Sequence, residues 1–133
     1  MIDIESEIYT ILSDALEAAF PDIYVTGEYM NAPPSFPCAS IMESDNYSSL
    51  NRRDSSDKEK FGMLMYEINV YSNKSHGRKS ECKAIMRLIA EKFYSLNFTR
   101  LALTPIPNLF DASVFRLTAR FRAESDGTNI YRR

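Results

Sequence analysis

The sequence predicts a single α+β domain, with two helices packed on one face of one antiparallel or mixed β-sheet of about five strands. The chain has 133 residues, which is enough for one hydrophobic core but not for two. Hydrophobic residues make up 44% of it and charged residues 26%, a balance typical of globular proteins. The predicted strands are grouped along the chain and their faces alternate, which favours this sheet over a doubly wound parallel one.

The first predicted helix covers residues 4–20, where apolar residues recur every three or four positions. Glu5 and Glu7 lie in its first turn, where carboxylates interact favourably with the helix dipole. Pro21 ends the helix, because proline cannot continue the hydrogen-bond ladder. Residues 23–30 are rich in β-branched and aromatic types and predict a strand.

Three prolines within residues 33–37 predict an extended connection, and residues 38–43 then suit a second, short strand. Residues 46–60 have almost nothing to bury and are expected to form an irregular loop. Residues 61–72 are the longest predicted strand, with one apolar face and one mixed face. The mixed face is a candidate contact with a partner and carries Met63, Met65, Glu67, Asn69 and Tyr71.

The second predicted helix begins near Arg78 and ends near Leu96, with an apolar stripe towards the core. On its solvent side, Arg87 and Glu91 are four residues apart and are expected to pair. Residues 98–103 predict a short strand that is broken by the prolines that follow it.

Residues 113–123 alternate strictly and predict the clearest strand of the chain. Its polar side carries a row of arginines: Arg116, Arg120 and Arg122. One interpretation is the solvated face of an antiparallel sheet, with acids such as Glu67 opposite the row. A subunit interface is the second interpretation, and contact with DNA phosphates, which a formal charge of −2 disfavours, is the third. We expect residues 1–123 to form the domain and residues 124–133 to form a flexible tail.

No catalytic, cofactor or metal site is predicted. His76 is the only histidine and lies in a polar turn, and Cys38 and Cys82 are expected to be reduced, buried thiols. The four glycines are too scattered to form a phosphate-binding loop.

A nuclease-like set of Asp22, Glu81 and Lys83 is disfavoured, because Glu81 and Lys83 fall in a predicted helix rather than on one side of a strand. The N-terminus is acidic where a signal peptide would be basic, and no apolar run approaches the ~18 residues that span a membrane. We therefore expect a cytosolic protein.

Three segments together resemble tail-terminator (tail-completion) proteins of long-tailed bacteriophages and related prophage elements. They are Pro-Ser-Phe-Pro-Cys-Ala-Ser-Ile at 34–41, Tyr-Glu-Ile-Asn-Val-Tyr-Ser at 66–72 with the following glycine-containing turn and helix, and Phe-Arg-Leu-Thr-Ala-Arg-Phe-Arg at 115–122. The resemblance covers most of the chain. It implies a subunit without an active site or cofactor that forms a hexameric ring, caps the tail tube and offers a face to the head connector.

The partners implied are further copies of the chain, the tail tube protein and the head–tail connector protein, with no specific nucleic acid and no membrane. The implied location is the tail–head junction of the virion, after assembly in the host bacterial cytoplasm. A ring requires one surface patch to bind a different patch on the next copy. Our candidates for the two patches are the mixed face with Met63, Met65, Glu67 and Tyr71 and the row of Arg116, Arg120 and Arg122. The alternatives are another neck or head-completion protein and, in a different class, a small metal-dependent hydrolase.

Overall fold

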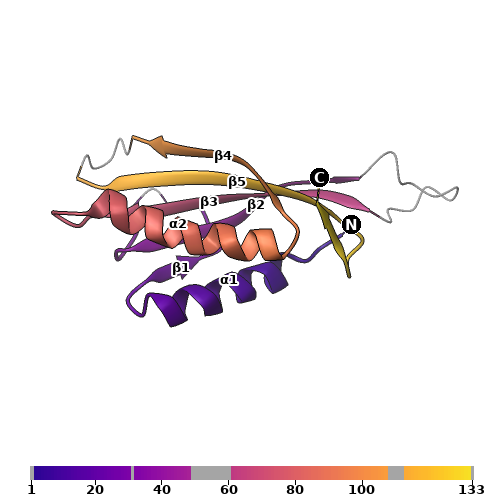
Figure 1. The fold of residues 1–133 in the computed structure, drawn as a ribbon, viewed down its shortest axis with the longest axis horizontal. Coiled ribbons are helices and arrows are strands. Elements are labelled where there is room, and N and C mark those ends of the chain that lie inside the picture. The colour runs from indigo at the N-terminus through magenta and orange to yellow at the C-terminus, as the bar shows by residue number, and fades with distance from the viewer. Residues whose placement is uncertain (1, 31, 49–60, 108–112, 133) are drawn as a thin grey trace, which may run out of the picture.

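A computed structural model describes residues 2–30, 32–48, 61–107 and 113–132, which form one mixed β-sheet and two helices (Figure 1). The predicted α+β class is therefore confirmed. In chain order the elements are α1 (Glu5–Ala19), β1 (Tyr24–Thr26), β2 (Cys38–Ser48), β3 (Gly62–Ser72), α2 (Arg78–Ser95), β4 (Thr99–Ile106), β5 (Phe115–Ser125) and β6 (Ile130–Arg132).

The strands follow the order β1-β2-β3-β5-β4, and only the pair β1 and β2 is parallel. β3 pairs with β5 along its whole length. On the other side of β5, β4 pairs as far as Arg122 and β6 continues from Ala123. The sheet therefore has α1 and β1 towards one edge and β4 at the other.

One hydrophobic core joins both helices to one face of the sheet, which we call the inner sheet face. Alternate residues of β3, such as Tyr66 and Ile68, and their partners in β5 belong to the same buried cluster as the apolar stripes of α1 and α2. Four aromatic rings lie at its centre, where Phe93 of α2 stacks on Phe121 with their centroids 4.3 Å apart.

The end of α2 shows how sequence fixes a boundary. Asn97 adopts a left-handed backbone (φ 69°), and its N–H donates to the Tyr94 carbonyl at 3.0 Å. The N–H of Phe98 donates to the Phe93 carbonyl at 2.9 Å, and the two rings are in contact. This is a Schellman motif, in which a residue that tolerates positive φ ends the helix and an apolar contact holds the turn.

β2 is longer than the sequence predicted. It continues past residue 43 to Ser48, so residues 46–48 of the expected loop belong to a strand, and residues 49–60 lie outside the described part of the chain. The extension could not be predicted from the polar residues 44–48 themselves, because their strand conformation depends on pairing with β3. The Asn46 side chain also donates to the Ile2 carbonyl at 2.7 Å.

The expected flexible tail is also corrected. β5 continues to Ser125, and β6 folds back onto it through a turn in which the Asp126 carboxylate accepts hydrogen bonds from the N–H groups of Thr128 and Asn129. Asn97 Nδ2 donates to the Ile130 carbonyl at 3.0 Å and ties β6 to the end of α2. β4, in turn, passes through Pro105 to Ile106, which an edge strand tolerates because one side of its backbone is unpaired.

Candidate functional site

The side of the sheet opposite the core, which we call the outer sheet face, carries every residue that the sequence singled out as an interface candidate. The register pairs Met65 with Arg122, Glu67 with Arg120, and Tyr71 with Arg116. Met63 lies at the end of the same face, opposite Glu124. The mixed face of β3 and the arginine row of β5 are therefore one continuous surface.

This continuity corrects the expectation of two separate patches. Residues of cross-strand pairs have Cβ atoms about 4.5–5.5 Å apart, so the two groups cannot meet each other as opposite halves of a head-to-tail contact. The outer sheet face supplies one contact surface, and a ring needs two further patches elsewhere.

A salt bridge crosses the middle of the outer sheet face, where Arg120 Nη2 lies 3.1 Å from Glu67 Oε1. The acid opposite the arginine row is thus confirmed. The Arg120 side chain is 55% exposed, and so the pair itself contributes little to stability. Its significance is that Arg120 presents an oriented guanidinium group at the surface.

Asn69 organises the neighbouring part of this face from a fully buried position. Its Oδ1 accepts hydrogen bonds from Arg116 Nε at 2.9 Å and from Thr118 Oγ1 at 2.6 Å. One buried amide therefore fixes two side chains of β5.

One end of the outer sheet face is closed by the segment between β1 and β2. The Tyr71 hydroxyl donates to the Met30 carbonyl at 2.7 Å, and the Arg116 guanidinium lies over the rings of Tyr29 and Tyr71 at 5.5 and 5.7 Å. Tyr71 is only 1% exposed, so the expectation that it is an exposed contact residue is wrong. Burial raises the pKa of Tyr71 to about 12, against the lowering effect of Arg116.

The other end of the outer sheet face stays accessible. Met63, Met65 and Arg122 are half-buried there, and Tyr47, the β2 partner of Met63, is 47% exposed. Arg122 Nε is buried and has no hydrogen-bond acceptor among the residues that the structure describes. A buried donor without an acceptor costs about 1–3 kcal/mol.

The thiols and the histidine do not form a reactive site. Cys38 and Cys82 are free and buried, as the sequence predicted, and burial raises the pKa of each thiol to about 12. Thiols in such surroundings are poor nucleophiles. His76 is exposed in the turn before α2.

Glu81, which belongs to the nuclease-like set, has other partners. Glu81 accepts a hydrogen bond from Ser72 Oγ at 2.6 Å and pairs with Lys74 at 3.0 Å, so it holds the first turn of α2 against the end of β3. Across residues 2–30, 32–48, 61–107 and 113–132, no three His, Cys, Asp or Glu side chains are grouped as metal ligands would be.

Neither α1 nor α2, the helices of the described ranges, is long and apolar enough to cross a membrane. The sequence matches no model of a known protein family, and no curated protein matches it either.

A half-buried carboxyl lies on the inner side of β2, where Glu43 accepts hydrogen bonds from the Tyr66 hydroxyl and Asn46 Nδ2, both at 3.3 Å. Burial raises the pKa of Glu43; the hydrogen bond from Asn46 lowers it, and the neighbouring charge of Glu5 raises it. A carboxyl whose pKa is raised on folding is favourable below its unfolded pKa and loses that stability as the pH rises through the folded value.

We therefore expect Glu43→Gln to be more stable than the unmodified protein at pH 7, with an advantage that shrinks as the pH falls towards 4. Urea unfolding at several pH values measures this difference. Glu28→Gln, which changes an exposed carboxyl, should alter the free energy of unfolding by less than about 0.5 kcal/mol at pH 7. A Glu43→Gln variant less stable than the parent at pH 7 would show that the ionised carboxylate is favourable in the folded state.

Proposed function

We propose that this chain is a structural subunit of a phage tail, a tail terminator that forms a ring, caps the tail tube and joins it to the head connector. The resemblance of three segments to this family suggests the role, and it implies a hexameric ring. The observation that carries the proposal is the exposed part of the outer sheet face, where Glu67 orients the Arg120 guanidinium group beside the half-buried Arg122. Such a surface suits a protein partner better than water.

The chemistry of this surface fits a subunit contact. Arginine is enriched at protein interfaces, because its planar guanidinium group binds carboxylates in a fixed geometry. Methionine adapts its flexible side chain to an opposing surface, and Met63 and Met65 flank the arginines across the β3–β5 pair. A ring contact needs two different patches on each copy, and the outer sheet face is a single patch. We therefore assign the outer sheet face to the contact with the tail tube protein.

The direct test is negative-stain electron microscopy of the purified protein mixed with tail tubes of the same virus. We expect rings at one end of the tubes and a fixed tube length when the protein is present during polymerisation. Tubes that stay uncapped at saturating protein would overturn the proposal. Rings found on DNA-filled heads but never on tubes would instead indicate another neck or head-completion protein.

Charge reversal at Arg120 tests the assigned surface. Arg120→Glu is expected to weaken tube capping about tenfold or more while leaving the protein folded. The reversed residue faces Glu67, and this like-charge pair costs up to about 1 kcal/mol of stability. Capping is scored as the fraction of closed tube ends over a range of protein concentrations, and circular dichroism checks the fold.

The matched control is the double variant Glu67→Arg/Arg120→Glu, which restores the internal ion pair with its polarity inverted. It should recover the stability lost in Arg120→Glu but not the capping. Full capping by the double variant would mean that the salt bridge acts only within the subunit.

A further inference from the structure

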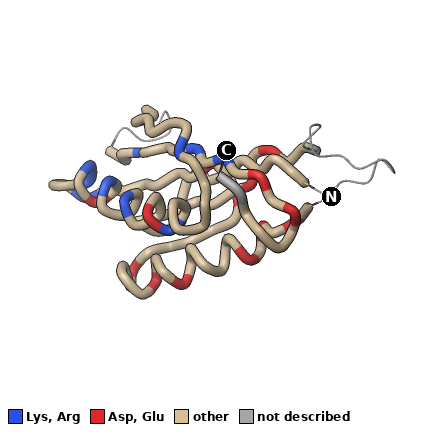
Figure 2. The backbone as a smooth tube through the Cα atoms, turned by 45° about the vertical axis from the view of Figure 1, so that its right-hand side comes forward, with Lys and Arg blue, Asp and Glu red and all other residues tan. Residues whose placement is uncertain are grey.

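The two helices carry opposite charge, which the formal net charge of −2 conceals. α1 has four acidic residues and no basic one: Glu5, Glu7, Asp14 and Glu17. α2 has five basic residues, Arg78, Lys79, Lys83, Arg87 and Lys92, against two acidic ones, Glu81 and Glu91. Figure 2 shows only acidic charges along α1, at the bottom of the view, and a concentration of basic charges on α2.

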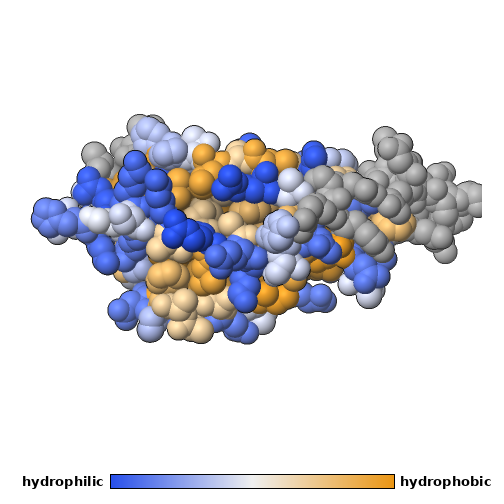
Figure 3. All heavy atoms as spheres, in the orientation of Figure 1, coloured by the Kyte–Doolittle hydropathy of each residue, from blue (hydrophilic) through white to orange (hydrophobic). Residues whose placement is uncertain are grey.

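A groove runs between α2 and the edge strand β4, and we call it the α2–β4 groove. It consists of two adjoining cavities of about 520 and 310 Å³ that share Arg87, Ala90 and Arg100. Its floor is apolar and is formed by Phe98, Phe121 and Leu117. In Figure 3 apolar atoms are visible between the hydrophilic residues of α2 and the upper edge of the molecule, where β4 lies.

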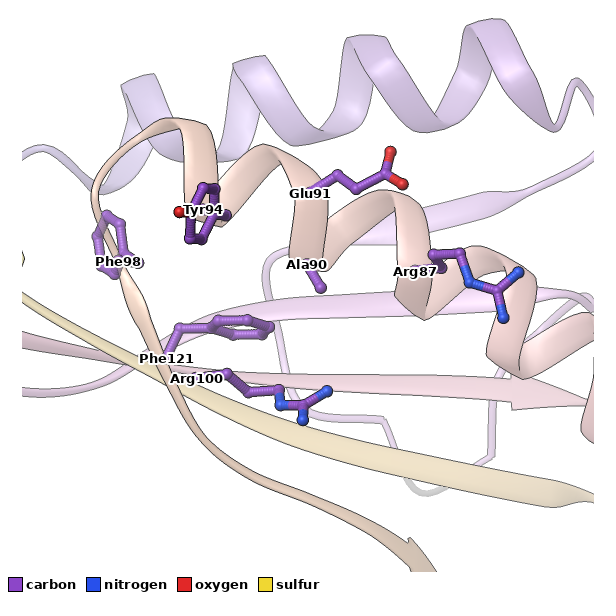
Figure 4. A pocket seen from close by; sticks show the side chains of 7 residues that line it. All are labelled: Arg87, Ala90, Glu91, Tyr94, Phe98, Arg100 and Phe121. Carbon is purple, nitrogen blue, oxygen red and sulfur yellow. The ribbon is translucent and has the colours of Figure 1, made fainter.

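Basic side chains on the rim of this groove have no acidic partner within the described ranges. Lys83 and Arg87 on α2 and Arg100 on β4 line it, and none of the three forms a salt bridge there. The pairing of Arg87 with Glu91 expected from their spacing is therefore wrong. Figure 4 shows the Glu91 carboxylate on the upper side of α2 in this view, apart from both guanidinium groups. An arginine that precedes a glutamate by four residues is also the weaker orientation for such a pair.

The exposed stripe of α1 matches the groove in charge and carries an apolar residue between its acids. Glu7, Ile11 and Asp14 follow one another at four and three residues, so they project from one side of the helix. The buried stripe, which includes Ile8 and Leu12, faces the core. Ile11 is 41% exposed and stands between the two carboxylates, as an apolar anchor does in a helix bound in a groove.

We propose that α1 of one copy docks into the α2–β4 groove of the next copy, with Ile11 on the apolar floor and Glu7 and Asp14 against the rim formed by Lys83, Arg87 and Arg100. The inference rests on the proposed function, because it supplies the two unlike patches that a ring needs. α1 is anchored beside β1, where the Tyr9 hydroxyl donates to the Val25 carbonyl, whereas the groove borders β4 at the opposite edge of the sheet. The contact is therefore head-to-tail and repeats from copy to copy.

Charge complementarity selects a second copy as the occupant. Opposite potentials steer association and reject wrong partners, while the apolar contact contributes most of the affinity. The outer sheet face remains free in this arrangement, since both patches lie on the helix side and at the edges of the sheet. The ring contact and the tube contact therefore use different surfaces.

Two single charge reversals and their mixture test the contact. Arg87→Glu disables the groove and Asp14→Arg disables the helix, and each alone is expected to weaken self-association at least about tenfold in sedimentation velocity. An equimolar mixture of the two variants should associate more tightly than either alone. In the mixture the unchanged helix of Arg87→Glu meets the unchanged groove of Asp14→Arg, and the reversed helix of Asp14→Arg meets the reversed groove of Arg87→Glu, so opposite charges face each other at both contacts. Association of the unmodified protein should also weaken as salt rises.

The control variants change the same charges away from the contact: Lys79→Glu, exposed at the start of α2, and Asp22→Arg, exposed after α1. Both should associate like the unmodified protein. The inference is overturned if the unmodified protein stays monomeric at millimolar concentration, if Arg87→Glu and Asp14→Arg associate normally, or if their mixture gains nothing. Rings that form without this contact yet still cap tubes would overturn the inference alone, whereas intact rings that ignore tubes would overturn the proposed function alone.

Discussion

Replacing Phe93 with alanine is expected to lower the free energy of unfolding by about 3–5 kcal/mol. Phe93 is completely buried, and its ring contacts those of Phe121, Phe98 and Tyr66 at centroid distances of 4.3, 4.9 and 5.7 Å. Its removal leaves a cavity between α2 and the inner sheet face that these rigid rings cannot fill. Because the chain has no tryptophan, urea unfolding followed by circular dichroism is the suitable measurement.

The neighbouring tyrosine provides the control. Tyr94 is 66% exposed, and we expect Tyr94→Ala to change the free energy of unfolding by much less than Phe93→Ala. If both substitutions destabilised the protein equally, the centre of the core would lie elsewhere. Loss of Phe93 should also weaken the Schellman turn, since Phe98 would lose its apolar partner at the end of α2.

The elements with strong local patterns could be predicted from the sequence. The apolar stripe of residues 4–20 placed α1 within one residue at either end, and Pro21 marked the boundary. The alternation of residues 113–123 separated the core side of β5 from the arginine row and predicted an acid opposite that row. In each case the periodicity of burial is visible in consecutive residues.

The missed elements depend on contacts that are distant in sequence. The polar end of β2 is a strand because β3 lies beside it, and the last residues pair with β5 through the Asp126-Gly127 turn. That dipeptide was a usable hairpin signal, because glycine readily adopts positive φ, here 93°. The outer sheet face was found in part, but the burial of Tyr71 and Asn69 depends on the register and on the segment before β2.

The α2–β4 groove could not be found from the sequence, because its two walls meet only in the folded chain. The α1 half of the proposed ring contact is nevertheless visible in the sequence. Residues 5–19 contain four acids and no base, and Ile11 interrupts the acidic side of the helix. An apolar residue in a charged stripe is ordinary on its own, and it becomes informative only when a groove of opposite charge is known.

The second large effect is expected from Asn69→Leu, which should lower the free energy of unfolding by about 2–4 kcal/mol although it adds apolar surface to a buried position. Leucine has the same branched side-chain skeleton as asparagine, with two bulkier methyl groups, but offers no acceptor to Arg116 Nε and Thr118 Oγ1. Among the described residues, Arg116 is then a partly buried charge held by the faces of Tyr29 and Tyr71. Denaturant unfolding gives the stability change.

Asn73→Leu is the matched control, because Asn73 is exposed just after β3, and its substitution should cost less than about 0.5 kcal/mol. A neutral or stabilising Asn69→Leu would mean that β3 and β5 hold Arg116 in place without the buried amide. If the amide is needed, Asn69→Leu should also reduce tube capping at temperatures where the domain is still folded. Without the amide, the outer sheet face would be less rigid at the end that the segment between β1 and β2 covers. Arg120, which follows Thr118 on the same face of β5, would then be held less firmly in the position that contacts the tube.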